Sequence, residues 1–97
     1  MKPYTFHPQA DEEYAQAAQY YAAVSPELGA RFFDEIERLI AEARQHPDRF
    51  FRFCPPARRA LARKFPYSVV YLDEADRVLI VAVMHAKRRP GYWLKRL

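Results

Sequence analysis

The stretch Tyr67–His85, YSVVYLDEADRVLIVAVMH, decides the fold of this chain. Two apolar runs, Tyr67–Leu72 and Arg77–His85, flank the polar tetrapeptide Asp73–Asp76. Runs rich in β-branched and aromatic residues on either side of a polar turn predict a β-hairpin. The second run is apolar on both of its faces, which predicts a central position in the sheet.

Further strand candidates lie before this hairpin. Residues Ala57–Phe65, ARRALARKF, predict a strand that leads directly into it. Near the N-terminus, the segment KPYTF predicts a short strand with Tyr4 and Phe6 on one side. The segment PDRFFRFCPP, residues 47–56, leaves open one more short extended piece.

A first helix is predicted after the N-terminal strand. Pro8 suits the first turn of a helix, where its missing N–H costs nothing. One face of this helix carries apolar residues at helical spacing, namely Ala10, Tyr14, Ala17, Ala18 and Tyr21. Near its positive N-terminal end stand three acids, Asp11, Glu12 and Glu13. The small alanines on the apolar face allow a second helix to approach closely.

A second helix is predicted after the break VSPELG, residues 24–29. Ser25 is a suitable N-cap, and Pro26 is a suitable first helical residue. Pro47 is expected to end the helix. Its apolar positions are Phe32, Phe33, Ile36, Leu39, Ile40 and Ala43. Two helices joined by so tight a break predict an antiparallel helical hairpin.

The order of elements, β-α-α-β-β-β, predicts an α+β fold whose helical hairpin covers one face of a mainly antiparallel sheet. A length of 97 residues without low-complexity sequence predicts a single domain over residues 1–97. The single cysteine, Cys54, excludes an intrachain disulfide and is expected to be a packed thiol. No apolar run approaches the roughly 18 residues of a membrane helix, and no signal peptide is visible, so no membrane partner and a cytoplasmic location are expected.

Neither a cofactor nor a metal is expected. The chain has 2 glycines and no GxGxxG, so it cannot line a nucleotide cradle. The three histidines, His7, His46 and His85, stand far apart and lack cysteine or acidic companions at ligand spacing.

Charge is divided unevenly along the chain. Residues 1–48 carry four cations and nine acids, a net of −5, whereas residues 49–97 carry twelve cations and three acids, a net of +9. So large an excess of one sign favours a polyanionic or acidic protein partner for the second half. The alternative is that the charges on the two faces only keep the protein soluble.

The basic residues fall into two groups. Arg58, Arg59, Arg63 and Lys64 are expected on one strand, with Arg59 and Arg63 on one face and Arg58 and Lys64 on the other. At least one of Arg58 and Arg59 is expected to form a salt bridge with the acidic helices. The second group follows the last strand and comprises Lys87, Arg88, Arg89, Lys95 and Arg96, with Tyr92 and Trp93 among them.

These side chains supply the candidate binding site. Arginine binds phosphate or carboxylate through two hydrogen bonds, and aromatic rings offer stacking planes. The last strand is expected to project the basic, aromatic segment that follows it. The expected target-binding residues are Arg58, Arg59, Lys87, Arg88, Arg89 and Tyr92.

Cleavage of RNA is a second possibility for the same residues. It needs a base for the 2′-hydroxyl, a cation for the phosphorane and an acid for the leaving oxygen. Near the end of the last strand, the candidates for these roles are His85, Arg88 and Tyr92. A structural interpretation competes at two positions: His85 as a histidine at the edge of the core, and Trp93 as an aromatic that pins the C-terminus.

The chain resembles the RelE/ParE superfamily of bacterial toxin–antitoxin toxins, and within it the ParE-like branch. The resemblance spans nearly the whole sequence. Its markers are Tyr20-Tyr21, PELGARFFDEI at 26–36, RRALARKFPYSVVY at 58–71 and VAVMHAKRRPGYW at 81–93. It implies the β-α-α-β-β-β fold and an acidic or amphipathic antitoxin that wraps the toxin in a hetero-oligomer.

The resemblance implies two alternative targets. RelE-like members cut mRNA on the ribosome with basic residues of the sheet, whereas ParE-like members inhibit DNA gyrase without nuclease chemistry. The resemblance matches Arg59, Arg63, Lys64, Arg88 and Tyr92 loosely to the ribonuclease set, which with His85 makes six candidates for cleavage. The segment FFRFCPPA, residues 50–57, stands where the ribonuclease branch has a lysine-rich segment. This departure favours the gyrase inhibitor over the endoribonuclease. A basic nucleic-acid-binding module without toxicity is the third possibility, and it predicts steep salt dependence on naked DNA.

Overall fold

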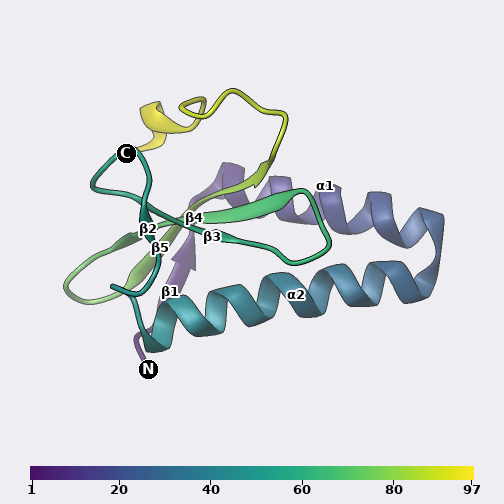
Figure 1. Ribbon diagram of the computed structural model, residues 1–97, viewed down its shortest axis with the longest axis horizontal. Helices are drawn as coiled ribbons and strands as arrows, with labels where there is room; N and C mark the ends of the chain where they lie inside the picture. Colours follow the sequence, from purple (N-terminus) through teal and green to yellow (C-terminus); the bar gives the residue numbers. More distant parts are fainter.

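The computed structural model describes residues 1–97, and Figure 1 shows two long helices beside a twisted sheet. The elements are β1 (Tyr4–Phe6), α1 (Pro8–Val24), α2 (Pro26–Gln45), β2 (Phe51–Arg52), β3 (Arg58–Leu61), β4 (Tyr67–Asp73), β5 (Val78–His85) and a 3₁₀ turn η1 (Leu94–Arg96). No helix of the chain combines the length and apolar composition that crossing a lipid bilayer requires.

The predicted α+β fold is confirmed. The five strands are ordered β1-β5-β4-β3-β2, with β1 parallel to β5 and every other pair antiparallel. The apolar strand β5 has neighbours on both sides, as its sequence predicted. Strand β2 is the short extended piece that the sequence left open, since Phe51 and Arg52 pair with Arg59 and Arg58.

The strand predicted at Ala57–Phe65 is shorter than expected and ends at Leu61. Arg63 and Lys64 lie in the turn toward β4, where Lys64 adopts a left-handed backbone with φ of 65°. The amide N–H of Arg63 donates to Glu35 of α2 at 2.6 Å, so this turn bends toward the helices. The prediction that both basic residues share the strand faces of Arg58 and Arg59 is therefore wrong.

The helical hairpin follows its local signals closely. The side chain of Ser25 accepts a hydrogen bond from the N–H of Leu28 at 3.1 Å and caps α2. α2 ends at Gln45, two residues before Pro47. Phe33 is the exception, because its side chain is 51% exposed and stacks on Tyr14 at the edge of the hairpin.

The two helices approach closely at Gly29. A Cβ built there would lie 2.8 Å from the Cα of Ala22 and 2.9 Å from its Cβ. Gly29→Ala is expected to lower the free energy of unfolding by about 1 kcal/mol, because overpacking outweighs the gain in helix propensity. Urea denaturation would measure the change, with Ala30→Gly as a control for propensity alone. A more stable Gly29→Ala variant would contradict this close packing.

Apolar side chains cover both faces of the sheet. On the face toward the helices, the core contains Phe32, Ile36, Leu39, Ile40, Val69, Tyr71, Ile80 and Val83. On the other face, a smaller core contains Ala57, Val70, Val81, Ala82, Met84 and Trp93. Figure 1 shows the C-terminal segment, coloured yellow, across the sheet from α2. Residues after β5 therefore complete the second core.

Candidate functional site

The C-terminal segment, residues 86–97, begins with a basic turn. Lys87, Arg88 and Arg89 are all exposed. The turn is fixed at the end of β5, because the N–H of Lys87 donates to His85 Nδ1 and the N–H of Arg88 donates to the His85 carbonyl, each at 3.0 Å. The turn thus presents three cationic side chains at the surface from a tight connection to the central strand.

Beyond Pro90 the segment folds back onto the sheet. Trp93 is 0% exposed and its ring lies 6.0 Å from that of Phe53. The prediction that Trp93 pins the C-terminus is confirmed, whereas the prediction that the whole segment projects is wrong. The Nε1 of Trp93 is buried without a hydrogen-bond partner, which costs about 1–3 kcal/mol and offsets part of the gain from burying the ring.

Glu13 of α1 ties the folded-back residues to the sheet. Its carboxylate accepts hydrogen bonds from the Tyr92 hydroxyl at 2.8 Å and from the Val83 N–H at 3.0 Å. The Arg96 guanidinium donates to the same carboxylate at 2.8 and 3.0 Å and to the Val81 carbonyl at 2.9 Å. The side chains of Glu13 and Arg96 are only 16% and 7% exposed. The hydrogen bond that Arg96 donates to Glu13 raises the pKa of Arg96.

Tyr92 holds one of the exposed cations. The Arg88 guanidinium lies 3.8 Å from the centre of the Tyr92 ring, a cation–π contact. Burial raises the pKa of the Tyr92 phenol, and its hydrogen bond to Glu13 raises that pKa further. A phenol with a raised pKa is a weaker acid, and the hydroxyl of Tyr92 already donates its hydrogen bond to a carboxylate.

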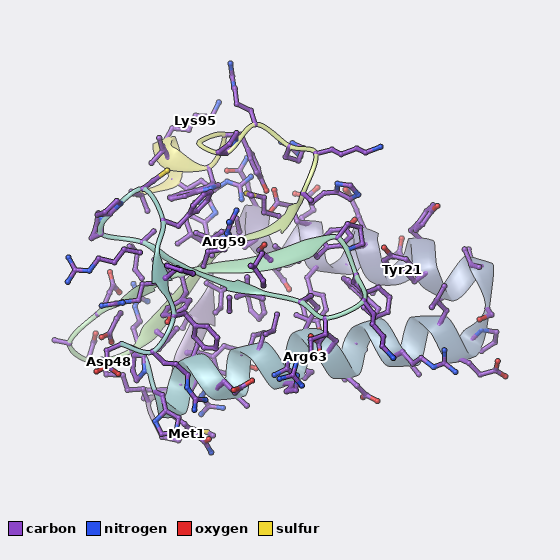
Figure 2. All side chains as sticks on the ribbon, viewed as in Figure 1. Met1, Tyr21, Asp48, Arg59, Arg63 and Lys95 are labelled. Atoms are coloured by element: carbon purple, nitrogen blue, oxygen red, sulfur yellow. The ribbon has the colours of Figure 1, made fainter.

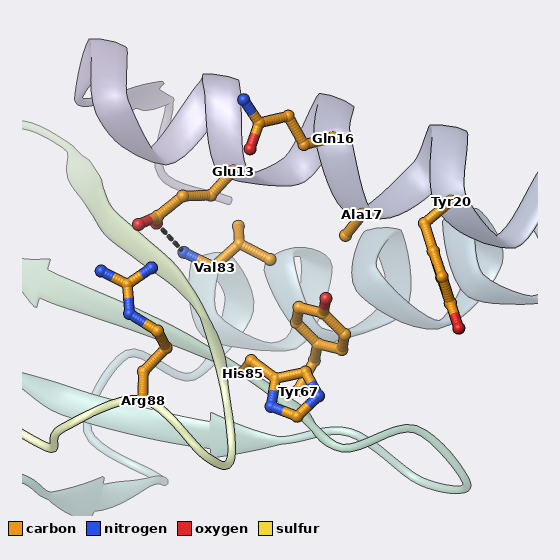
Figure 3. Close-up of a pocket in the computed structure, with 8 residues that line it drawn as sticks. All are labelled: Glu13, Gln16, Ala17, Tyr20, Tyr67, Val83, His85 and Arg88. Atoms are coloured by element: carbon orange, nitrogen blue, oxygen red, sulfur yellow. Dashed lines mark hydrogen bonds between the residues drawn. The ribbon is translucent and has the colours of Figure 1, made fainter.

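A pocket of about 250 Å³ separates α1 from the end of β5. Figure 3 shows Glu13 and Tyr20 of α1 on one side and Tyr67, His85 and Arg88 on the other. The rings of Tyr67 and His85 meet edge to face with centres 5.0 Å apart. Burial raises the pKa of Tyr67. His85 therefore sits at the edge of the core and also faces a cavity.

The two arginines of β3 make no ion pair with the helices, contrary to the prediction. The Arg58 guanidinium donates to the backbone carbonyls of Phe50 at 2.8 Å and Asp48 at 3.3 Å. The Arg59 guanidinium lies on the other face of the sheet, 4.1 Å from the centre of the Phe53 ring. Backbone carbonyl groups of the chain after α2, and not a carboxylate, therefore hold the Arg58 guanidinium.

The six candidates for RNA cleavage do not converge. His85 and Arg88 share the pocket beside α1, whereas Arg63 and Lys64 line a separate cavity of about 470 Å³ against α2. That second cavity also contains acids, among them Glu35, whose pKa is lowered by its hydrogen bond from Arg38. Figure 2 shows Arg63 beside α2, Arg59 over the sheet, and Lys95 on the side of the sheet away from α2.

Sequence reasoning missed Glu13 and Arg96 as site residues. Glu13 was seen only as an acid near a helix N-terminus, and Arg96 only as one more cation. The uneven charge of the two halves was the available signal, since this partly buried pair joins the acidic half to the basic half. No group of three or more His, Cys, Asp or Glu side chains is arranged to hold a metal ion.

Comparison with known proteins identifies the family. Residues 4–90 match the family model described as the ParE toxin of the type II toxin–antitoxin system parDE. A solved structure titled "Chromosomal ParDE TA system from P. aeruginosa" has the same fold, with a TM-score of 0.75 at 13% identity over 90% of this chain and 98% of that chain. A search of curated proteins found no match. The resemblance drawn from the sequence motifs is confirmed, and the chain belongs to the ParE toxin family of type II toxin–antitoxin systems.

Proposed function

We propose that the protein inhibits bacterial growth by binding DNA gyrase through its basic C-terminal turn. The observation that carries this proposal is the exposure of Lys87, Arg88 and Arg89 on a turn fixed to the central strand. A preorganised cationic surface loses little freedom on binding, which favours recognition of a carboxylate or phosphate surface. Arg59, which lies over Phe53 on the face of the sheet that the C-terminal segment covers, would extend this surface.

Arg58 and Tyr92 have a different part in this proposal. Both were predicted to bind the target, and both are engaged inside the protein, Arg58 with backbone carbonyls and Tyr92 with Glu13. We assign them to support of the binding surface. Contact with the target then falls to Arg59 and the three exposed cations of the turn.

The separation of the cleavage candidates supports inhibition without chemistry. General acid–base cleavage needs both proton-transfer groups within hydrogen-bond reach of one phosphodiester. Arg63 and Lys64 line a cavity that does not include His85, and the Tyr92 hydroxyl donates to Glu13. The pocket shared by His85 and Arg88 is the one observation that favours the alternative, a ribosome-dependent mRNA endoribonuclease.

An antitoxin is the proposed partner in a hetero-oligomer. The neighbour of known structure is a ParDE toxin–antitoxin system, and the net charge of +9 in residues 49–97 suits an acidic partner. By covering the basic turn, such a partner would block the gyrase contact. The proposal places this action in the cytoplasm, where gyrase works on DNA.

The variant His85→Asn tests the proposed function. The asparagine Oδ1 replaces Nδ1 as the acceptor for the Lys87 N–H, while the titrating ring is removed. We expect inhibition of gyrase supercoiling to change by less than about threefold, because recognition by a surface needs no proton transfer, whereas loss of a general acid or base costs roughly 10²-fold or more. Supercoiling of relaxed plasmid, measured over a dilution series, gives the comparison. A loss of growth inhibition on the order of 10²-fold in a folded His85→Asn protein would favour the ribonuclease.

A further inference from the structure

The end of the chain is fastened to the protein by side chains. From Arg88 onward, the backbone hydrogen bonds close local turns, from Arg88 to His85, Tyr92 to Arg89, Leu94 to Gly91, Arg96 to Trp93 and Leu97 to Leu94. None of them joins residues 89–97 to a strand or helix. Docking of these residues therefore depends on what Tyr92, Trp93 and Arg96 contact.

Two of those three side chains form hydrogen bonds with Glu13. Tyr92 donates one hydrogen bond to its carboxylate, and Arg96 donates two. The third side chain, Trp93, gains from burial but loses a hydrogen bond at Nε1. Glu13 is also held in place, because the Val83 N–H on the edge of β5 donates to it (Figure 3). One carboxylate thus links α1, the edge of β5 and the C-terminal segment.

We propose that Glu13 is a positioning residue that holds the C-terminal segment against the sheet and, through Tyr92, fixes Arg88. Glu13 orients the Tyr92 hydroxyl, and the Tyr92 ring lies 3.8 Å from the Arg88 guanidinium. The consequence for growth inhibition rests on the proposed function, whereas the docking itself does not. The family match ends at residue 90, before Tyr92, Trp93 and Arg96.

The protein contains its own reporter of docking, because Trp93 is its only tryptophan and is fully buried. Glu13→Gln keeps the size of the side chain and removes the charge that faces Arg96. We expect red-shifted tryptophan emission and an increase in the exposed population of Trp93, measured by acrylamide quenching. The increase should be on the order of 10²-fold, the low end of the range for breaking a buried ion pair, because this pair is only partly buried. Asp11→Asn is the matched control, since Asp11 is exposed in the first turn of α1 and should leave emission unchanged.

Arg96→Gln provides a second variant that leaves α1 intact. It removes the other half of the ion pair from the end of the chain, so it tests the proposal even if Glu13→Gln fails to fold by circular dichroism. The double variant Glu13→Gln, Arg96→Gln should expose Trp93 little more than either single variant, because both substitutions remove the same contact. Buried tryptophan in folded Glu13→Gln or in Arg96→Gln would overturn the proposal.

Growth inhibition distinguishes the positioning role from mere attachment. With wild-type protein that inhibits growth, Glu13→Gln should reduce inhibition at equal expression and Asp11→Asn should not. Release of Trp93 with undiminished inhibition would overturn the role of Glu13 in positioning Arg88. Wild-type protein that inhibits neither growth nor gyrase would instead remove the proposed function, while the fluorescence measurements would still decide whether Glu13 docks the segment.

Discussion

Replacing Phe32 with alanine is expected to lower the free energy of unfolding by about 3–5 kcal/mol. Phe32 is 0% exposed and stands at the centre of an aromatic cluster on the helix side of the sheet. Its ring lies 4.9 Å from that of Tyr21, 5.2 Å from Tyr67 and 5.3 Å from Phe65. Removing it leaves a cavity bounded by an α1 residue, a β4 residue and the turn between β3 and β4. A loss of this size is a large part of the roughly 5–15 kcal/mol that stabilises a typical domain.

Phe33 is the natural control for this substitution. It is the next residue of α2 but is 51% exposed, so Phe33→Ala should cost no more than about 1 kcal/mol. Urea denaturation of the two variants would measure the difference. Equal losses for Phe32→Ala and Phe33→Ala would contradict the orientation of α2 against the sheet.

The double variant Arg88→Ala, Arg89→Ala is expected to abolish growth inhibition and leave the fold intact. Both residues are exposed. Apart from the Arg88 contact with the Tyr92 ring, neither makes a side-chain interaction within the protein. Their removal should cost less than about 1 kcal/mol of stability. A target that binds the turn through opposite charge would lose two cationic contacts at once.

Arg31→Ala with Arg49→Ala is the matched control. This pair removes the same charge from exposed positions in α2 and the loop after it, far along the chain from the C-terminal turn. Induced expression at equal protein levels, followed by colony counts, gives the measurement. Full toxicity of the Arg88, Arg89 variant would refute the assignment of the basic turn. Lost toxicity together with a collapsed circular dichroism spectrum would show that the pair is structural.

The helices could be predicted from the sequence because their ends are set locally. Pro8, Ser25 and Pro26 act through bonds within one turn, and the structure places α1 and α2 at the bounds that these residues indicate. The hairpin of β4 and β5 was likewise predictable, since its turn and its two apolar strands are contiguous. Phe33 was placed wrongly because the apolar face of α2 is narrower than the run of apolar residues.

The parts that could not be predicted depend on distant partners. The two-residue strand β2 exists only because β3 lies beside it. β3 ends early because the following turn bends to meet Glu35. The pair of Glu13 and Arg96 joins positions 83 residues apart, which no spacing rule reaches. The basic turn was predicted from composition alone. Its attachment through Tyr92 could not be predicted, because Tyr92 contacts Glu13 only in the folded chain.

Supercoiling of relaxed plasmid by purified gyrase, in the presence of wild-type protein, tests the central claim most directly. The same preparation would be added to ribosomes carrying an mRNA with a defined codon in the A site. We expect loss of supercoiling at rising protein concentration, relief of that loss when Arg88 and Arg89 are replaced, and intact ribosome-bound mRNA. Undisturbed supercoiling together with cleavage of the mRNA at the A-site codon would contradict the account and establish the ribonuclease in its place.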